Sequence, residues 1–274
     1  MTKEKRNKLI SLNLEEKISI SKNIIKEAIN KFGRDKIAIA WTGGKDSTTM
    51  IWLYREVCNE LSIQLPRCIF IDEGDVFDEI IEHIEQTRRK WDIDLTILRN
   101  EDILKKIKKI RDIIKIKELN DRNKKELKLI GFEGDEFLFE PESYVGNHLM
   151  KTVPLKIFIE ENGIEAISTA IRWDEQEARE DEEFFSPREK PKHTRIHPIL
   201  HFRERDIWHT ILKYKIPYCR LYEQGYRSLG SRYNTQKLSD LPAWEQDLES
   251  IPERVGRGQE KEKIMDQLRQ LGYM

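Results

Sequence analysis

The chain has 274 residues, of which 38% are hydrophobic and 36% are charged. This apolar content is too high for a disordered chain, and 49 Lys plus Arg against 50 Asp plus Glu leave no basic excess that would indicate a nucleic-acid partner. No run approaches the roughly 18 apolar residues of a membrane span, and the charged segment Met1–Lys8 does not resemble a signal peptide. The cysteines Cys58, Cys68 and Cys219 lack metal-ligand spacing, so a cytoplasmic location is expected.

Strands and helices alternate in the first third of the chain. Apolar residues at helical spacing predict helices over 14–32, 50–61 and 76–91. Between them, continuous apolar runs predict buried strands at 37–41, 68–71 and 95–98. This alternation indicates an α/β protein with a parallel sheet flanked by helices.

The pattern changes after the third strand. Residues 99–128 contain twelve Lys or Arg against six Asp or Glu, which favours a charged, solvated helical insertion within 99–147. A docking surface for an acidic partner or a nucleic acid is the alternative interpretation. The α/β pattern then resumes with a helix at 148–162, strands at 166–171 and 196–200, and a helix at 205–214. We therefore predict one domain over 1–235 and a helical C-terminal extension over 236–274, with an amphipathic segment near 261–271.

The strongest local motif is Trp41-Thr-Gly-Gly-Lys-Asp-Ser47, between a predicted buried strand and an amphipathic helix. Two glycines let the backbone turn tightly and approach an anion, and the following helix presents unpaired N–H groups and its positive dipole end. Thr42 and Ser47 add hydroxyls, and Lys45 adds a cation. A plain turn with Ser47 as the helix cap is the structural alternative.

This loop resembles the S-G-G-K-D-S pyrophosphate loop of the ATP pyrophosphatases of the phosphoadenosine-phosphosulfate reductase family, with Thr42 in place of the usual Ser. The resemblance is closest to the small subunit of sulfate adenylyltransferase, and it implies an adenine nucleotide alpha hydrolase-like fold. Further matching segments follow in the family's order over about 30–235: Phe70-Ile-Asp-Glu-Gly74, His148-Leu-Met-Lys-Thr152, the segment from Ala170 to Arg179, His197-Pro-Ile-Leu200, and the segment from Leu221 to Gly230.

The resemblance implies a role for each matching residue. The loop and Asp72 are expected to bind ATP and its pyrophosphate, with Mg²⁺ as the accompanying ion. A guanidinium at the end of a strand can clamp an oxyanion, which suits Arg172. The expected sets are, for catalysis, Lys45, Asp46, Lys151 and Arg172; for ATP, Thr42, Gly43, Gly44, Lys45, Asp46, Ser47 and Asp72; and for the second substrate, His148, Arg172, Asp174, Arg179, Tyr226, Arg227 and Ser228.

The cysteine content separates the reactions of the family. The reductase branch needs a nucleophilic cysteine near its C-terminus, whereas no cysteine follows Cys219 here. The prediction is therefore ATP-dependent adenylyl transfer to an oxyanion, sulfate first, in an oligomer that can work with a GTPase partner subunit. The alternatives are a sulfonucleotide reductase-type enzyme, an ATP pyrophosphatase for sulfur insertion into DNA or tRNA, and a non-enzymatic nucleotide-binding subunit.

Three histidines repeat at intervals of four residues, namely His193, His197 and His201. On a helix this spacing would align three imidazoles for zinc. Pro191 and Pro198 interrupt the stretch, so no metal site is predicted there.

Overall fold

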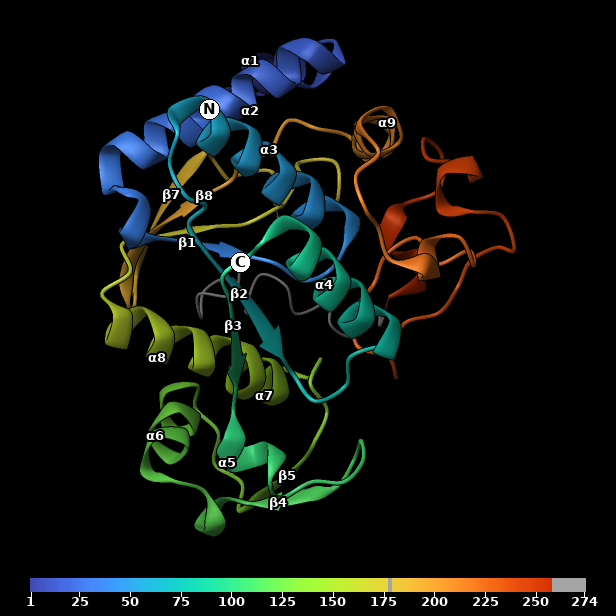
Figure 1. Cartoon of the computed structure of the whole chain (residues 1–274). Helices are drawn as coiled ribbons and strands as arrows, with labels where there is room; N and C mark the ends of the chain where they lie inside the picture. The colour runs from blue at the N-terminus through green and yellow to red at the C-terminus, as the bar shows by residue number, and fades with distance from the viewer. Residues whose placement is uncertain (177–178, 258–274) are drawn as a thin grey trace.

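A computed structural model describes residues 1–176 and 179–257. Its centre is a six-stranded sheet in the order β3-β2-β1-β6-β8-β7, in which all neighbouring strands are parallel except β7 and β8 (Figure 1). This confirms the predicted α/β class with a parallel sheet. The strands are β1 (Ile37–Ala40), β2 (Arg67–Asp72), β3 (Leu95–Arg99), β6 (Ala166–Ser168), β7 (Phe185–Glu189) and β8 (Lys192–Ile196).

Helices cover both faces of this sheet, which explains why its central strands are apolar throughout. In β1, Ile37 and Ile39 face the large core shared with α2 and α3, while Ala38 faces the smaller core beneath α8. Helix α9 packs on α3. The main helices are α1 (Lys3–Ser11), α2 (Leu14–Phe32), α3 (Lys45–Leu61), α4 (Asp78–Trp91), α8 (Val153–Asn162) and α9 (Glu204–Tyr214).

Local sequence signals set the bounds of the longest helix, α2. Asn13 caps its first turn by accepting a hydrogen bond from the backbone N–H of Glu16, and the Glu16 carboxylate accepts one in return from the N–H of Asn13. Gly33 ends the helix in a left-handed conformation, at φ 78°. The predicted span of 14–32 is confirmed.

The insertion at 99–147 is only partly helical, so the prediction of a charged helical insertion needs correction. It contains α5 (Glu101–Leu104), β4 (Ile113–Lys115), the 3-10 helix η2 (Ile116–Glu118), α6 (Asp121–Leu129), β5 (Glu136–Leu138) and α7 (Tyr144–Asn147). Strands β4 and β5 form an antiparallel pair. Apolar side chains hidden among the lysines, including Ile114 and Leu127, build a separate hydrophobic cluster with Phe137 and Leu149.

Two predicted strands also have different limits. The strand expected at 166–171 ends at Ser168, and the one expected at 196–200 is β8, which ends at Ile196. His197–Leu200 instead form a turn, in which the Leu200 N–H donates to the His197 carbonyl. The hairpin partner β7 was missed because Pro187 and its charged neighbours are atypical of a strand.

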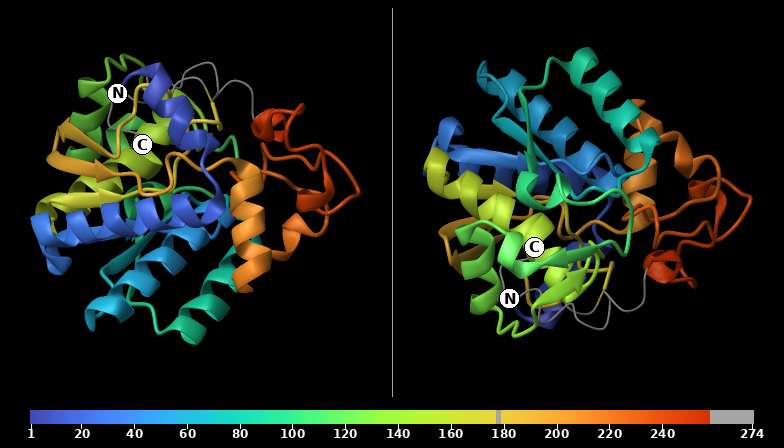
Figure 2. Two further views of the ribbon diagram at one scale, coloured as in Figure 1. Left: turned by 90° about the horizontal axis from the view of Figure 1, so that it is seen from above. Right: turned by 90° about the horizontal axis from the view of Figure 1, so that it is seen from below.

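The C-terminal region lies beside α9 and projects from one side of the sheet (Figure 2). Within 236–257 the chain forms two short 3-10 helices, η6 (Ala243–Glu245) and η7 (Glu253–Gly256), in place of the expected α-helical extension. The amphipathic segment predicted near 261–271 lies outside the described residues. In the described part of the chain, no helix is both long enough and apolar enough to cross a bilayer.

Candidate functional site

The glycine loop joins the carboxyl end of β1 to the start of α3. Thr42 and Ser47 close it, because the backbone N–H of Thr42 donates to Ser47 Oγ at 3.2 Å and the two hydroxyls lie 3.1 Å apart. Gly43 has φ 73°, and a Cβ at this position would lie 2.7 Å from a methyl of Ile80, so the loop requires glycine there. Gly44, the residue before α3, has no side chain to cap this 17-residue helix, whose positive end is at the pocket. The N–H of Lys45 donates to the Tyr222 hydroxyl at 3.0 Å.

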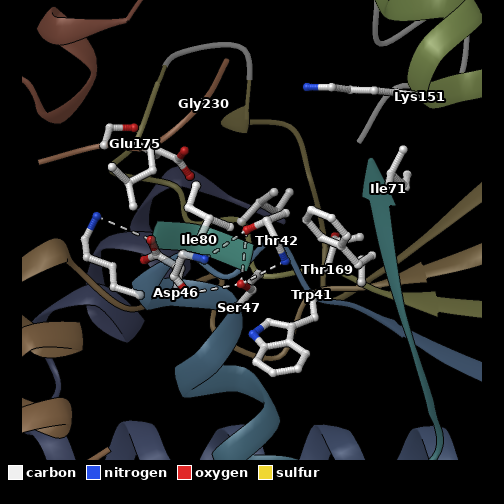
Figure 3. Close-up of a pocket in the computed structure, with 18 of the residues that line it drawn as sticks. Trp41, Thr42, Asp46, Ser47, Ile71, Ile80, Lys151, Thr169, Glu175 and Gly230 are labelled. Carbon is white, nitrogen blue, oxygen red and sulfur yellow. Dashed lines mark hydrogen bonds and ion pairs between the residues drawn. The ribbon is translucent and has the colours of Figure 1, made fainter. Parts of the chain in front are cut away.

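The pocket next to this loop has two chemically different parts (Figure 3). One part is apolar and is formed at the carboxyl ends of β2 and β6 and from α4 and α8. The other is polar and begins with Thr42, Asp46 and Ser47 of the loop, as the sticks in Figure 3 show. The apolar lining includes Ile69, Phe70, Ile71, Val76, Ile80, Leu155 and Ile171. From β1 the sheet continues to β2 on one side, and from β6 it continues to β8 on the other. The pocket therefore lies at the topological switch point between β1 and β6, where open α/β sheets bind ligands.

Cationic side chains outside the loop line the pocket, among them Lys151, Arg179 and Arg195. In Figure 3 the Lys151 side chain extends across the space beside the loop, and its ammonium pairs with Glu73 at 2.7 Å. Arg179, expected to bind the second substrate, lines the pocket, pairs with Glu175 and is buried. Arg195 of β8 is also buried and lines the pocket. Burial lowers the pKa of Arg195 to about 9, so it remains a cation at neutral pH.

Beneath the loop lies a buried cluster of ion pairs. Arg172 is fully buried, and its guanidinium contacts Asp46, Glu253 and, through Nε at 2.9 Å, Asp174. The Lys45 ammonium pairs with Glu253 and lies 3.7 Å from Glu204. Burial lowers the pKa values of both cations, but these carboxylates more than reverse that effect and raise them above their ordinary values. Both cations therefore stay charged.

Glu253, which pairs with both Lys45 and Arg172, lies in a segment that contains none of the predicted motifs. Residues 252–257, called here the C-terminal strap, place Glu253, Arg254 and Arg257 in the pocket lining. Arg254 pairs with Glu175 at 2.7 Å. Arg257 pairs with Glu142 at 3.0 Å and donates to the Leu229 carbonyl at 2.8 Å. Thr169 and Arg195 also line the pocket without having been predicted. Nothing in the local sequence around these five residues distinguishes them from ordinary polar residues.

Most of the predicted site residues lie at or beneath the pocket. Those that line it are Thr42, Gly44, Lys45, Asp46, Ser47, Lys151, Arg179 and Ser228. Gly43 packs against Ile80 and fixes the turn of the loop. The buried ion-pair cluster contains Lys45 and Asp46 as well as Arg172, Asp174 and Arg227, the last paired with Glu204 at 2.8 Å.

The remaining three residues point elsewhere. Asp72 pairs with Arg99 at 2.8 Å and accepts from the N–H of Gly74. His148 is fully buried against Glu126 of the insertion, at 2.9 Å. Tyr226 packs its ring edge against Phe77. The structure therefore does not bring Asp72, His148 or Tyr226 into the pocket.

The three regularly spaced histidines do not converge. His193 contacts the Pro191 carbonyl, His197 contacts Thr169, and His201 contacts the Lys17 carbonyl. Among residues 1–176 and 179–257 no group of three or more His, Cys, Asp or Glu is arranged to hold a metal ion.

Together, the fold and the pocket define an α/β protein with a glycine loop, followed by the start of a long helix, at the switch point of its sheet. Residues 36–237 match the model of the phosphoadenosine phosphosulfate reductase domain. Because this match covers most of the chain, the protein belongs to that family, as the motif resemblance implied.

Over most of the chain, individual relatives share only about a quarter of its residues. The chain is 26% identical to adenosine 5′-phosphosulfate reductase 1 of Bacillus subtilis over 76% of each protein. It is 25% identical to the uncharacterized protein MJ0066 of Methanocaldococcus jannaschii over 71% of the chain, and 51% identical to a probable FAD synthase of Caenorhabditis briggsae over 17% of the chain. It spans only 35% and 9% of the lengths of these last two proteins.

Solved structures share the fold. The FMN adenylyltransferase of Candida glabrata, in complex with FMN and the ATP analogue AMPCPP, superposes with a TM-score of 0.60 at 20% identity. The superposition covers 90% of this chain and 74% of that one.

Proposed function

We propose that the protein transfers AMP from ATP to an oxyanion acceptor and releases pyrophosphate. The observation that supports this most directly is the two-part pocket. Its apolar part suits a nucleobase, and its polar part places a glycine loop and the start of α3 where a polyphosphate would lie. Family membership and the fold shared with an adenylyltransferase support the same reaction class.

In this proposal the loop holds the β- and γ-phosphates, which leave together as pyrophosphate. Lys151, Arg179 and Arg195 also line the pocket, and in this proposal they neutralise the charge that develops between the acceptor and the α-phosphate. Mg²⁺ is bound mainly by phosphate oxygens in such sites, and Asp46 would become its protein ligand by exchanging its contacts with Arg172 and Lys45 for the ion. An acceptor that is already an anion needs no general base.

Sulfate is the first proposed acceptor, on the strength of the motifs shared with the small subunit of sulfate adenylyltransferase. Formation of adenylylsulfate is steeply uphill, so this version includes a separate energy-coupling partner such as a GTPase subunit. A phosphate monoester such as FMN is the second acceptor. The segment 51% identical to a probable FAD synthase and the fold shared with FMN adenylyltransferase favour it.

The acceptor is identified by a pyrophosphate-release assay with ATP, Mg²⁺ and one candidate at a time: sulfate, FMN, tRNA or DNA. The expected result is pyrophosphate together with an AMP-containing product that mass spectrometry identifies. ADP and free phosphate as the main products would contradict the proposed reaction.

Thiol chemistry gives a second test of the reaction class. All three cysteines are buried, and none lines the pocket. Burial raises the pKa of Cys58 to about 11, that of Cys219 to about 11, and that of Cys68 further still, so none is a reactive thiolate at neutral pH. Replacing Cys219, the last cysteine, by Ser should leave pyrophosphate release within about twofold of the unmodified protein. A thiol-dependent reduction of adenylylsulfate that this change abolishes would restore the reductase alternative.

A further inference from the structure

A chain of three polar side chains leads from the pocket into the protein. Thr169 follows β6, lines the pocket and is 8% exposed. Its Oγ1 lies 2.8 Å from Nδ1 of His197, which is fully buried. On the other side of that ring, Nε2 lies 3.4 Å from a carboxylate oxygen of Glu182, which is also buried.

The charge of Glu182 decides where the imidazole carries its proton. Burial raises the pKa of Glu182, but the adjacent His197 and Ser186 side chains and the charge of Arg188 lower it well below its usual range, so the carboxylate is ionised. At 3.4 Å from Nε2 of His197 it acts on the ring as a nearby negative charge rather than through a hydrogen bond. Arg188 Nη2 lies 2.8 Å from the carboxylate. A neutral imidazole has one N–H, and the carboxylate beside Nε2 holds the proton on that nitrogen. Burial lowers the pKa of His197, which is consistent with the neutral ring.

The position of this proton determines what Thr169 can offer to a ligand. With its proton on Nε2, His197 presents Nδ1 as a hydrogen-bond acceptor. The Thr169 hydroxyl has a single proton and donates it to Nδ1, so only oxygen lone pairs remain on the pocket side. Thr169 can therefore accept a hydrogen bond from a ligand, but it has no proton to donate to a phosphate or carbonyl oxygen.

The place of Thr169 in the pocket indicates which part of a ligand it meets. Strands β6 and β2 both flank β1, so Thr169 and Ile71 extend from carboxyl ends on either side of the strand that carries the glycine loop. In Figure 3, Thr169 lies between Thr42 of the loop and Ile71 at the end of β2. Ile71 belongs to the apolar lining. Thr169 thus lies where the loop meets the apolar part of the pocket, the part that the proposed function assigns to the nucleoside.

We propose that Thr169 is a specificity-determining residue that accepts a hydrogen bond from a donor group on the nucleoside of ATP, with His197 and Glu182 as positioning residues that fix its acceptor state. The donor is the exocyclic amine of adenine or a ribose hydroxyl. This inference rests on the proposed ATP site and adds the group that reads the nucleoside.

The test is a calorimetric binding matrix. The full chain, Thr169→Val and Thr169→Ser are each titrated with ATP, purine riboside 5′-triphosphate, 2′-deoxy-ATP and 3′-deoxy-ATP. The unmodified protein should bind the analogue that lacks the contacted donor about tenfold more weakly than ATP. Thr169→Val should bind ATP about tenfold more weakly than the unmodified protein does, and its affinity for that analogue should be unchanged. The identity of the analogue shows whether the adenine amine or a ribose hydroxyl is the contacted donor. Thr169→Ser should retain the affinity for ATP.

Structural damage is separated from recognition by the pattern across the nucleotides. Thr210→Val serves as a matched control, because Thr210 is a buried threonine whose hydroxyl donates to the Asp206 carbonyl outside the pocket lining. It should leave all four affinities unchanged. Thr169→Val that weakens all four nucleotides equally, or that leaves ATP unaffected, would overturn the assignment to Thr169. If the unmodified protein binds none of the four, the proposed function itself fails and the assignment fails with it.

Discussion

The glycine loop and the C-terminal strap border the same pocket but are held in place in different ways. The loop is closed by contacts within six residues, from Thr42 to Ser47. The strap is held by ion pairs of Glu253, Arg254 and Arg257 with partners 79 to 208 residues away in the sequence. The loop contributes a backbone shape for an anion, whereas the strap contributes charges that keep Lys45 and Arg172 in position. A binding site can thus combine a local motif with a remote segment that has no recognisable motif.

The largest effect is expected from the strap. Glu253→Gln keeps the shape of the side chain but leaves Lys45 and Arg172 without their shared carboxylate. Removing one partner of a buried ion pair costs about 3–5 kcal/mol, and a loss of this size should appear in the free energy of unfolding measured by urea denaturation. Glu249→Gln is the matched control, because Glu249 is exposed and its pair with Arg205 is at the surface. Equal stability of the two variants would show that the strap does not hold the cluster.

The pH dependence of stability should differ between the unmodified protein and Glu253→Gln. Burial raises the pKa of Glu253, but Arg172 and Lys45 lower it well below 4.5, its ordinary value. A carboxyl group with a depressed pKa in the folded state stabilises the protein fully above pH 4.5, and this contribution falls as the pH drops below that value. The unmodified protein should therefore lose more stability than Glu253→Gln between about pH 5 and pH 3 in thermal melts. Parallel curves would contradict this assignment.

The loop should be sensitive in a different way at each of its two glycines. Gly43→Ala combines a left-handed backbone with a contact of 2.7 Å to Ile80, which together cost about 2–4 kcal/mol of stability and should also weaken ATP binding. Gly44 has φ −76°, and an added Cβ would be at least 3.3 Å from its neighbours. Gly44→Ala should therefore weaken ATP binding with little change in melting temperature. Similar melting temperatures for the two variants would show that the loop is not fixed by Gly43.

The smallest effect tests how the strap is docked. A Cβ at Gly230 would lie 2.1 Å from the Arg257 guanidinium, so Gly230→Ala should displace this buried side chain and weaken its pair with Glu142, at a cost of about 2 kcal/mol. The Gln236 amide, which donates to the Gly256 carbonyl at 2.9 Å, should then exchange its hydrogen faster. Gly134→Ala is the control, since its Cβ would meet only the Phe132 ring and the Glu136 carbonyl in the insertion. Unchanged exchange at Gln236 would show that Arg257 does not anchor the strap.

The sequence alone was sufficient for the α/β class, the strands β1 to β3, and the loop from Thr42 to Ser47. These features depend on short-range periodicity and on backbone conformations that glycine permits, so a window of ten to twenty residues contains the necessary information. The motif order was also enough to predict the family. The 3-10 turns of the strap and the β4–β5 pair were not predictable in this way, because Ile114 and Phe137 acquire their partners only from distant segments.

Tertiary structure decided what each charged side chain of the site does. Arg172 was expected to clamp an acceptor, yet three carboxylates surround it beneath the pocket, including Glu253 from 81 residues further along the chain. His148 was expected to bind substrate, yet it is buried against Glu126. A charge is stabilised by whichever opposite charge folding brings within a few ångströms, and sequence spacing does not specify that partner. The sequence therefore determined the site's backbone, and only the folded chain determined which cations line the pocket.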